Sequence, residues 1–171
     1  MKKNVFKWIG ILLLAITVFA AVPCAVAEGY AVSDNCVSLV ARFETCYYKA
    51  VKEPSGVWRV GYGHTKNVTE NTVVATEAEA RALLKEDLAR YASAVNSLIA
   101  NKTIAFQMNQ NRFDALTAFA FNCGNGNLEK LVKGRTAEEV AERILTYCKG
   151  GGKVLPTLVA RRQAEKALFV R

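Results

Sequence analysis

The stretch that decides the fold reads Glu44-Thr45-Cys46-Tyr47-Tyr48-Lys49-Ala50-Val51-Lys52-Glu53-Pro54-Ser55-Gly56-Val57-Trp58-Arg59-Val60-Gly61-Tyr62-Gly63-His64-Thr65. Its glycines and Pro54 predict turns, and residues 57–60 predict a short strand between glycines. We expect a helix that ends just past Glu44 and a hairpin that carries Glu53, with the two carboxylates facing each other across a groove. Two carboxylates in one cleft can divide the work of acid and base, as hydrolysis of a glycosidic bond requires.

This stretch resembles the catalytic signature of the phage-type lysozymes of glycoside hydrolase family 24. In that family a helix-borne glutamate is followed by an Asp or Cys and then a Thr, in a segment close to Pro-Ala-Gly-Val-Trp-Thr-Ile-Gly-Tyr-Gly-His-Thr. The resemblance implies that Glu44 is the general acid. It also places Glu53 at the Asp/Cys position and Arg59 at the Thr position. Glu53 and Arg59 therefore both depart from the family pattern.

These two departures leave three functional readings open. Glu53 carries one methylene more than Asp, and the Arg59 guanidinium cannot accept a proton as a hydroxyl can. The first reading is a working muramidase that cleaves the β-1,4 bond between N-acetylmuramic acid and N-acetylglucosamine. The second is a lysozyme-like protein with lost or reduced catalysis that binds peptidoglycan or a partner. The third is a basic protein that acts on membranes through its N-terminal segment or its last helix.

The resemblance covers most of the chain. It includes residues 76–88, the Phe-Asn-Cys-Gly segment at 121–124, and the Gly-Gly-Lys and Arg-Arg-x-x-Glu segments at 151–153 and 161–165. It implies a mainly α member of the α+β class, namely a lysozyme-like single domain with two lobes. The smaller lobe is a β-hairpin, and a long helix joins it to a helical C-terminal lobe.

Helical spacing of apolar residues and capping signals predict where the helices lie. Asp34 is expected to cap a helix that delivers Glu44 at its C-terminal end, and Thr76 with Glu79 forms a capping box that opens the long helix. Three further helices are predicted over residues 107–121, after Thr136, and over residues 158–169. The run Gly150-Gly151-Gly152 is expected to break the chain.

The resemblance also implies several supporting residues. His64, the only histidine, is expected to pair with Asp87 as a structural ion pair. Arg161 is expected to contact the catalytic glutamate, with a solvated helix face as the alternative. Asn122 and Phe121 are expected on the cleft floor, although Phe121 also fits the core. We expect no cofactor and no metal, because one histidine without further ligands at suitable spacing is too little.

Composition limits the possible partners. The chain has 171 residues, of which 51% are apolar, so it can bury one core. Its formal net charge of +8 fits a polyanionic partner, and cell wall, nucleic acid and anionic membrane all meet that condition. No basic patch alternates with aromatics as in a nucleic-acid platform. We expect a monomer that acts on peptidoglycan and binds no nucleic acid.

The N-terminal residues 1–27 indicate export. Lys2 and Lys3 precede an uncharged run from Trp8 to Ala27, which ends in the cleavage pattern Ala25-Val26-Ala27. The segment fits a cleaved signal peptide, or a signal anchor that holds the chain in the inner membrane before release. In either case residues 28–171 form the lysozyme-like domain, which we expect in the periplasm or secreted.

The cysteine count agrees with export. Removal of residues 1–27 leaves an even number of cysteines in an oxidising compartment: Cys36, Cys46, Cys123 and Cys148. Four cysteines allow three disulfide connectivities, among which Cys123 with Cys148 is preferred because both lie in the C-terminal half. The alternative is a set of buried free thiols.

Overall fold

A computed structural model describes residues 29–171 of the chain. The expected signal peptide or anchor, residues 1–27, lies outside the described residues. Among residues 29–171 no helix is both long and apolar enough to cross a membrane.

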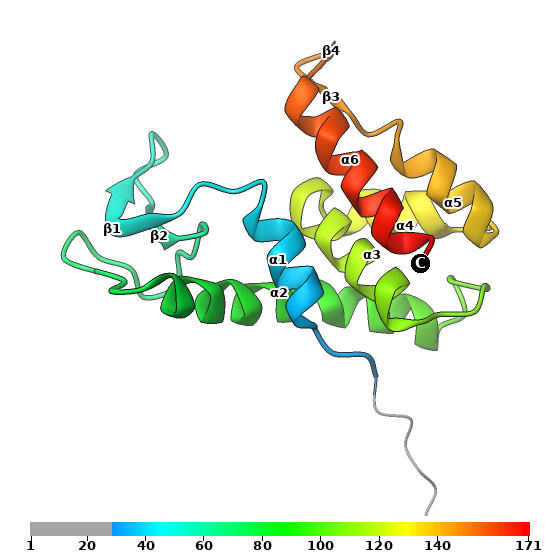
Figure 1. Cartoon of the computed structure of the whole chain (residues 1–171), viewed down its shortest axis with the longest axis horizontal. Coiled ribbons are helices and arrows are strands. Elements are labelled where there is room, and N and C mark those ends of the chain that lie inside the picture. Colours follow the sequence, from blue (N-terminus) through cyan, green and yellow to red (C-terminus); the bar gives the residue numbers. More distant parts are fainter. Residues whose placement is uncertain (1–28) are drawn as a thin grey trace, which may run out of the picture.

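The described residues form two lobes that share one long helix (Figure 1). The smaller lobe contains the antiparallel strands β1 (Tyr47–Lys52) and β2 (Trp58–Gly61). Helix α2 (Glu77–Ala100) runs beneath this lobe and continues beneath the helical lobe. The predicted fold class, a hairpin lobe and a helical lobe joined by a long helix, is confirmed.

Helix α1 (Asp34–Ala41) ends earlier than predicted, and its cap is a different residue. The Ser33 side chain accepts a hydrogen bond from the Asn35 N–H, so Ser33 is the N-cap and Asp34 is the first helical residue. The Phe43 N–H donates to the Val40 carbonyl at 2.9 Å, which tightens the chain into a turn. Glu44 therefore lies in a turn after the helix.

The hairpin carries Glu53 in its connecting turn, as predicted. The Glu53 N–H donates to the Val57 carbonyl at 2.8 Å, and the Gly56 N–H donates to the Glu53 carbonyl at 2.8 Å. Gly56 has a φ of +89°, which glycine adopts without steric cost. The outer edge of β1 is also paired, because the Ala50 N–H donates to the Thr72 carbonyl. These bonds hold the Glu53 backbone in one position.

Helix α2 begins at the predicted cap, but only half of the expected capping box forms. The Thr76 side chain accepts from the Glu79 N–H, whereas the Glu79 carboxylate accepts from the Ala75 N–H at 2.8 Å. One face of α2 is buried along its length, at Ala80, Leu84, Leu88, Ala92 and Val95. Both lobes therefore rest on this helix.

The helical lobe is built around the buried helix α3 (Gln110–Cys123). It also contains α4 (Asn125–Val132), α5 (Ala137–Ile144) and α6 (Pro156–Phe169). The short strands β3 (Lys149–Gly150) and β4 (Lys153–Val154) form a hairpin just before α6. The core side chains on α3 include Phe113, Leu116 and Phe119, all with no exposed surface.

Three boundaries in this lobe differ from the prediction. Helix α3 starts at Gln110, where Asn109 caps it, and extends to Cys123. Helix α4 was not predicted; it follows α3 after a single residue, Gly124, whose φ is +82°. The predicted break at residues 150–152 lies in the β3–β4 hairpin, where Gly150 ends β3 and Gly151 and Gly152 form the turn. Helix α6 starts at Pro156, two residues before the predicted start. The predicted cap of α5 at Thr136 is confirmed, with a complete capping box.

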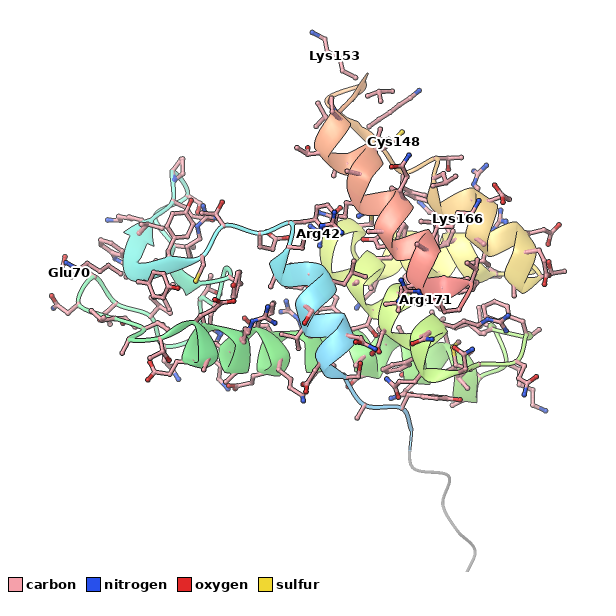
Figure 2. The ribbon with its side chains drawn as sticks, in the orientation of Figure 1. Arg42, Glu70, Cys148, Lys153, Lys166 and Arg171 are labelled. Atoms are coloured by element: carbon pink, nitrogen blue, oxygen red, sulfur yellow. The ribbon has the colours of Figure 1, made fainter. Side chains whose placement is uncertain are left out.

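The preferred Cys123–Cys148 disulfide is absent, and the four cysteines of residues 29–171 are free thiols. The Cys123 Sγ lies 2.5 Å from Nη1 of Arg162, which is fully buried, so the thiol contacts a guanidinium. Cys148 lies on the segment that leads into β3 (Figure 2). Cys36 is fully buried, and its Sγ donates to the Asp114 carbonyl at 3.4 Å. Cys36 therefore matches the buried-thiol alternative.

Candidate active site

Glu44 lies in the turn after α1, and its side chain is 28% exposed. Arg42, the C-cap of α1, lies between the two lobes (Figure 2). The Arg161 Nη1 of α6 donates to Glu44 Oε1 at 2.6 Å. The turn thus places one glutamate where the hairpin lobe and the helical lobe meet, against a cation of the helical lobe.

Arg161 is 4% exposed, so the alternative of a solvated helix face is wrong. Its guanidinium carbon lies 5.8 Å from the Phe43 ring centroid and 6.0 Å from that of Phe121. These distances are those of cation–π contacts. Its Nε donates to Glu165 Oε1 at 3.3 Å. The expected contact of Arg161 with Glu44 is present, and packing fixes the guanidinium that makes it.

Glu165, which was not among the site residues predicted from the sequence, is the central acceptor of a buried charge cluster. It has no exposed surface, and neither does Arg162. Arg162 Nε lies 2.8 Å from Glu165 Oε2, and Arg162 Nη2 donates to Glu165 Oε1 at 2.9 Å. Burial raises the pKa of Glu165 to about 7, against the lowering effect of the two guanidinium groups. The spacing i, i+3 and i, i+4 on one helix was the signal that could have found this cluster.

The second arginine of the cluster reaches the end of α3. Arg162 Nη2 donates to Asn122 Oδ1 at 2.8 Å, which fixes the side-chain amide of Asn122. Asn122 and Cys123 line a cavity of about 430 Å³ together with Asn127, Thr146, Tyr147, Lys149 and Leu158. The arginine therefore orients an exposed amide at the edge of a polar cavity.

Phe121 lines a different cavity, of about 540 Å³, formed by the hairpin lobe, α2 and the end of α3. Its ring meets Tyr91 edge to face, with the ring centroids 5.4 Å apart. The other lining residues are Gly63, Thr65, Lys66, Glu86, Asp87 and Arg90. The structure thus places Phe121 on a cavity wall at the junction of the lobes.

Glu53 and Arg59 form an ion pair on the hairpin. Arg59 Nη1 lies 2.8 Å from Glu53 Oε1, and both side chains are about one-third exposed, at 35% and 34%. The guanidinium carbon also lies 4.9 Å from the Tyr47 ring centroid, and Nη2 donates to the Tyr47 hydroxyl at 3.4 Å. The Arg59 Nε is buried without a hydrogen-bond partner in the structure. Arg59 therefore engages Glu53 at one oxygen, Oε1.

His64 and Asp87 join the hairpin lobe to α2. His64 Nδ1 lies 3.0 Å from each carboxylate oxygen of Asp87, and His64 is 7% exposed. The contact between His64 and Asp87 that the sequence predicted is present. No group of three His, Cys, Asp or Glu side chains within residues 29–171 is arranged to hold a metal ion.

The two-lobed fold with a glutamate at the junction and a second carboxylate on the hairpin defines a lysozyme-type glycoside hydrolase. The sequence model of the phage lysozyme family matches residues 41–165. This range contains Glu44, Glu53, Arg59, Asp87, Asn122 and Arg161. The chain belongs to the phage lysozyme family.

Individual relatives agree with this assignment. An endolysin of Acyrthosiphon pisum secondary endosymbiont phage 1 is 35% identical over 147 residues, covering 81% of this chain and 97% of the relative. A SAR-endolysin of Haemophilus phage HP1 is 31% identical over 153 residues, covering 80% of each chain. Among solved structures, the muramidase domain of SpmX from Asticaccaulis excentricus has 32% identity and a TM-score of 0.70. That comparison covers 84% of this chain and 99% of the domain.

Proposed function

We propose that this protein is a muramidase that hydrolyses the β-1,4 bond between N-acetylmuramic acid and N-acetylglucosamine in peptidoglycan. The observation that carries the proposal is the half-buried Glu44 at the junction of the lobes, held by Arg161, in a member of the phage lysozyme family. Cleavage of the glycan strands would weaken the cell wall and lyse the cell.

Glu44 is the general acid of the proposed mechanism. In an inverting glycosidase the acid protonates the leaving oxygen while a base activates water on the opposite face of the sugar. The Arg161 contact engages Oε1 of Glu44 at 2.6 Å, so Oε2 is the oxygen left to carry the proton toward the glycosidic bond. Phe43 and Phe121 keep the Arg161 guanidinium in place during this step.

Glu53 is the base, or the electrostatic support of the developing oxocarbenium ion. Its Oε1 is paired with Arg59, whereas its Oε2 accepts, among the described residues, from the Ser55 hydroxyl alone, at 3.5 Å. Oε2 is therefore the oxygen that can accept a proton from water. Arg59 cannot act as the base because its guanidinium stays protonated, and it holds Glu53 by a charge-assisted hydrogen bond.

The release of reducing ends from purified peptidoglycan tests the proposal. We expect the wild-type protein to release reducing ends and Glu44→Gln to lose about 10² to 10⁴ of that rate, the usual contribution of a general acid. Glu142→Gln is the matched control, because Glu142 is exposed on α5 and, within residues 29–171, pairs with Lys166 alone. Equal and negligible rates for wild type and Glu44→Gln would overturn the proposal.

The Glu53–Arg59 ion pair favours one alternative, a lysozyme-like protein that binds peptidoglycan, or a partner, with weakened catalysis. A guanidinium bound to the expected base lowers its ability to take a proton from water. Co-sedimentation with insoluble peptidoglycan separates the two proposals. Binding without release of reducing ends supports the alternative. Lysis without reducing ends that survives in Glu44→Gln would instead support action on the membrane.

The proposed site of action is the cell wall after export. The basic N-terminus, the uncharged run and the Ala25-Val26-Ala27 pattern support export, and one relative is named a SAR-endolysin. We propose the periplasm as the compartment, with the N-terminal segment either cleaved or tethered to the inner membrane before release. Fractionation of cells that express the full chain, followed by mass measurement of the exported product, distinguishes cleavage from tethering.

A further inference from the structure

The cluster of Arg161, Arg162 and Glu165 connects the two parts of the site that lie on different elements. Arg161 reaches Glu44 in the turn after α1, and Arg162 reaches Asn122 at the end of α3. The Glu165 carboxylate contacts both of these arginines. Within residues 29–171, it makes no hydrogen bond of its own to Glu44 or Asn122.

We propose that Glu165 is a positioning residue that holds Arg161 against Glu44 and Arg162 against Asn122, and so sets the orientation of the catalytic acid. This inference rests on the proposed function for its catalytic meaning. The geometry carries it: one buried carboxylate accepts hydrogen bonds from two adjacent guanidinium groups on the same helix.

Because the cluster is buried, its hydrogen bonds cannot be replaced easily. Arg161, Arg162 and Glu165 are 4%, 0% and 0% exposed, so water cannot replace a lost hydrogen bond. The two guanidinium groups carry two positive charges, and the ionised Glu165 compensates one of them at a distance of 2.8 to 3.3 Å. Without that carboxylate, the Arg161 guanidinium loses one of its two carboxylate partners. Removal of the Glu165 carboxylate therefore acts on Glu44 without touching it.

The groups that face the cluster come from several elements. Burial raises the pKa of the Cys36 thiol of α1, and Cys36 lies close enough to Glu165 for its carboxylate to raise that pKa further. Cys123, the last residue of α3, contacts Arg162. Glu44 faces Arg161 from the turn. Lys166 of α6 is turned toward Glu142 of α5 instead. Within residues 29–171, the acids paired with Arg161 are Glu44 and Glu165.

The test compares Glu165→Gln with wild type at pH 8, above the Glu165 pKa of about 7, by ¹⁵N NMR of the Arg161 Nε–H group, assigned through Arg161→Lys, and by kcat and KM for reducing-end release. We expect hydrogen exchange at this Nε–H to be about tenfold faster, because a neutral amide holds it less strongly than a carboxylate. The kcat should fall by about 10- to 100-fold, as for a small displacement of a catalytic group, with KM little changed. Glu142→Gln, which removes a carboxylate from Lys166 of the same helix, should leave both readouts unchanged.

Glu165→Asp provides the second variant if Glu165→Gln does not fold. It keeps the charge but is one methylene too short to reach both arginines, so we expect smaller changes in the same direction. Folded variants whose Arg161 Nε–H exchanges as slowly as in wild type would overturn the inference. The exchange rate is measured without substrate, so a protein that exchanges as expected but releases no reducing ends would contradict the proposed function alone.

Discussion

Arg161 Nη1 lies 2.6 Å from Glu44 Oε1, although the two residues are 117 positions apart in the chain. The contact joins the turn after α1 to the last helix, so the position of the expected acid depends on how α6 packs against α3. Arg161 makes a second contact, with Glu165, through its Nε. A single guanidinium therefore serves two carboxylates, one half-buried and one fully buried.

Arg161→Lys should separate the charge of this residue from its shape. An ammonium group is a point charge without the planar fork of guanidinium, so it cannot hold Glu44 and Glu165 at the same time. We expect the release of reducing ends to fall by about 10- to 100-fold, as for a small displacement of a catalytic group. Arg143→Lys, an exposed arginine on α5, should keep wild-type activity. Undiminished activity of Arg161→Lys would show that charge alone is enough.

The Glu53–Arg59 pair can be converted back to the family pattern. In the double variant Glu53→Asp with Arg59→Thr, the carboxylate is freed from the guanidinium and a hydroxyl becomes available to position water. If the ion pair only weakens the site, activity should rise by about tenfold. This increase corresponds to an activation free energy that is lower by roughly 1.4 kcal/mol. The rate of reducing-end release measures this change, with Lys49→Thr on β1 as the control. No gain would mean that the site works with a different geometry.

The His64–Asp87 pair should contribute to stability. Asp87→Asn leaves the nearly buried His64 without its charged acceptor, and we expect a loss of about 1 to 3 kcal/mol in the free energy of unfolding in urea. Its neighbour Glu86 pairs with Lys66 at 3.7 Å, and both side chains are more than half exposed. Glu86→Gln should therefore cost about 0 to 1 kcal/mol. Equal losses in the two variants would contradict a structural role of the buried pair.

Stability should also depend on pH through Glu165. Burial raises the pKa of its folded-state carboxyl to about 7, so the folded protein binds the proton more tightly than the unfolded chain. This contribution to stability is fully present below the unfolded pKa and is lost as the pH rises through about 7. Between pH 5 and pH 8 the unfolding free energy of wild type should fall by on the order of 2 kcal/mol relative to Glu165→Gln. Urea unfolding at both pH values measures it, and parallel pH dependences would contradict the shift.

The sequence allowed the hairpin lobe and the long helix to be predicted because their signals are local. Turn glycines, a short apolar run and the cap at Thr76 act within a few residues of one another. Helix α4 was missed because Asn125-Gly126 is typical of a turn. Its helix is stabilised by the burial of Leu128, Leu131 and Val132, which depends on the rest of the lobe.

The charge cluster of the candidate site could be predicted only in part. The resemblance placed Arg161 near Glu44, but Glu165 was not singled out because a glutamate on an amphipathic helix is usually exposed. Its burial follows from the packing of α6 against α3, which no local pattern encodes. The Glu53–Arg59 pair was foreseeable because the two residues carry opposite charges and lie on one short hairpin. The absence of the Cys123–Cys148 disulfide was not foreseeable from the count of cysteines.

Cys36 should be the least reactive of the four described thiols. It is fully buried on α1, it donates to the Asp114 carbonyl, and burial raises its pKa above the ordinary range of a thiol. Reaction with N-ethylmaleimide therefore requires a local opening, and we expect it to be about 10³-fold slower than that of Cys148 for an opening free energy of roughly 4 kcal/mol. Peptide mass mapping after timed labelling measures both rates in one sample, and labelling in urea should make them equal. Similar rates in the folded protein, or a disulfide at Cys36, would contradict the buried free thiol.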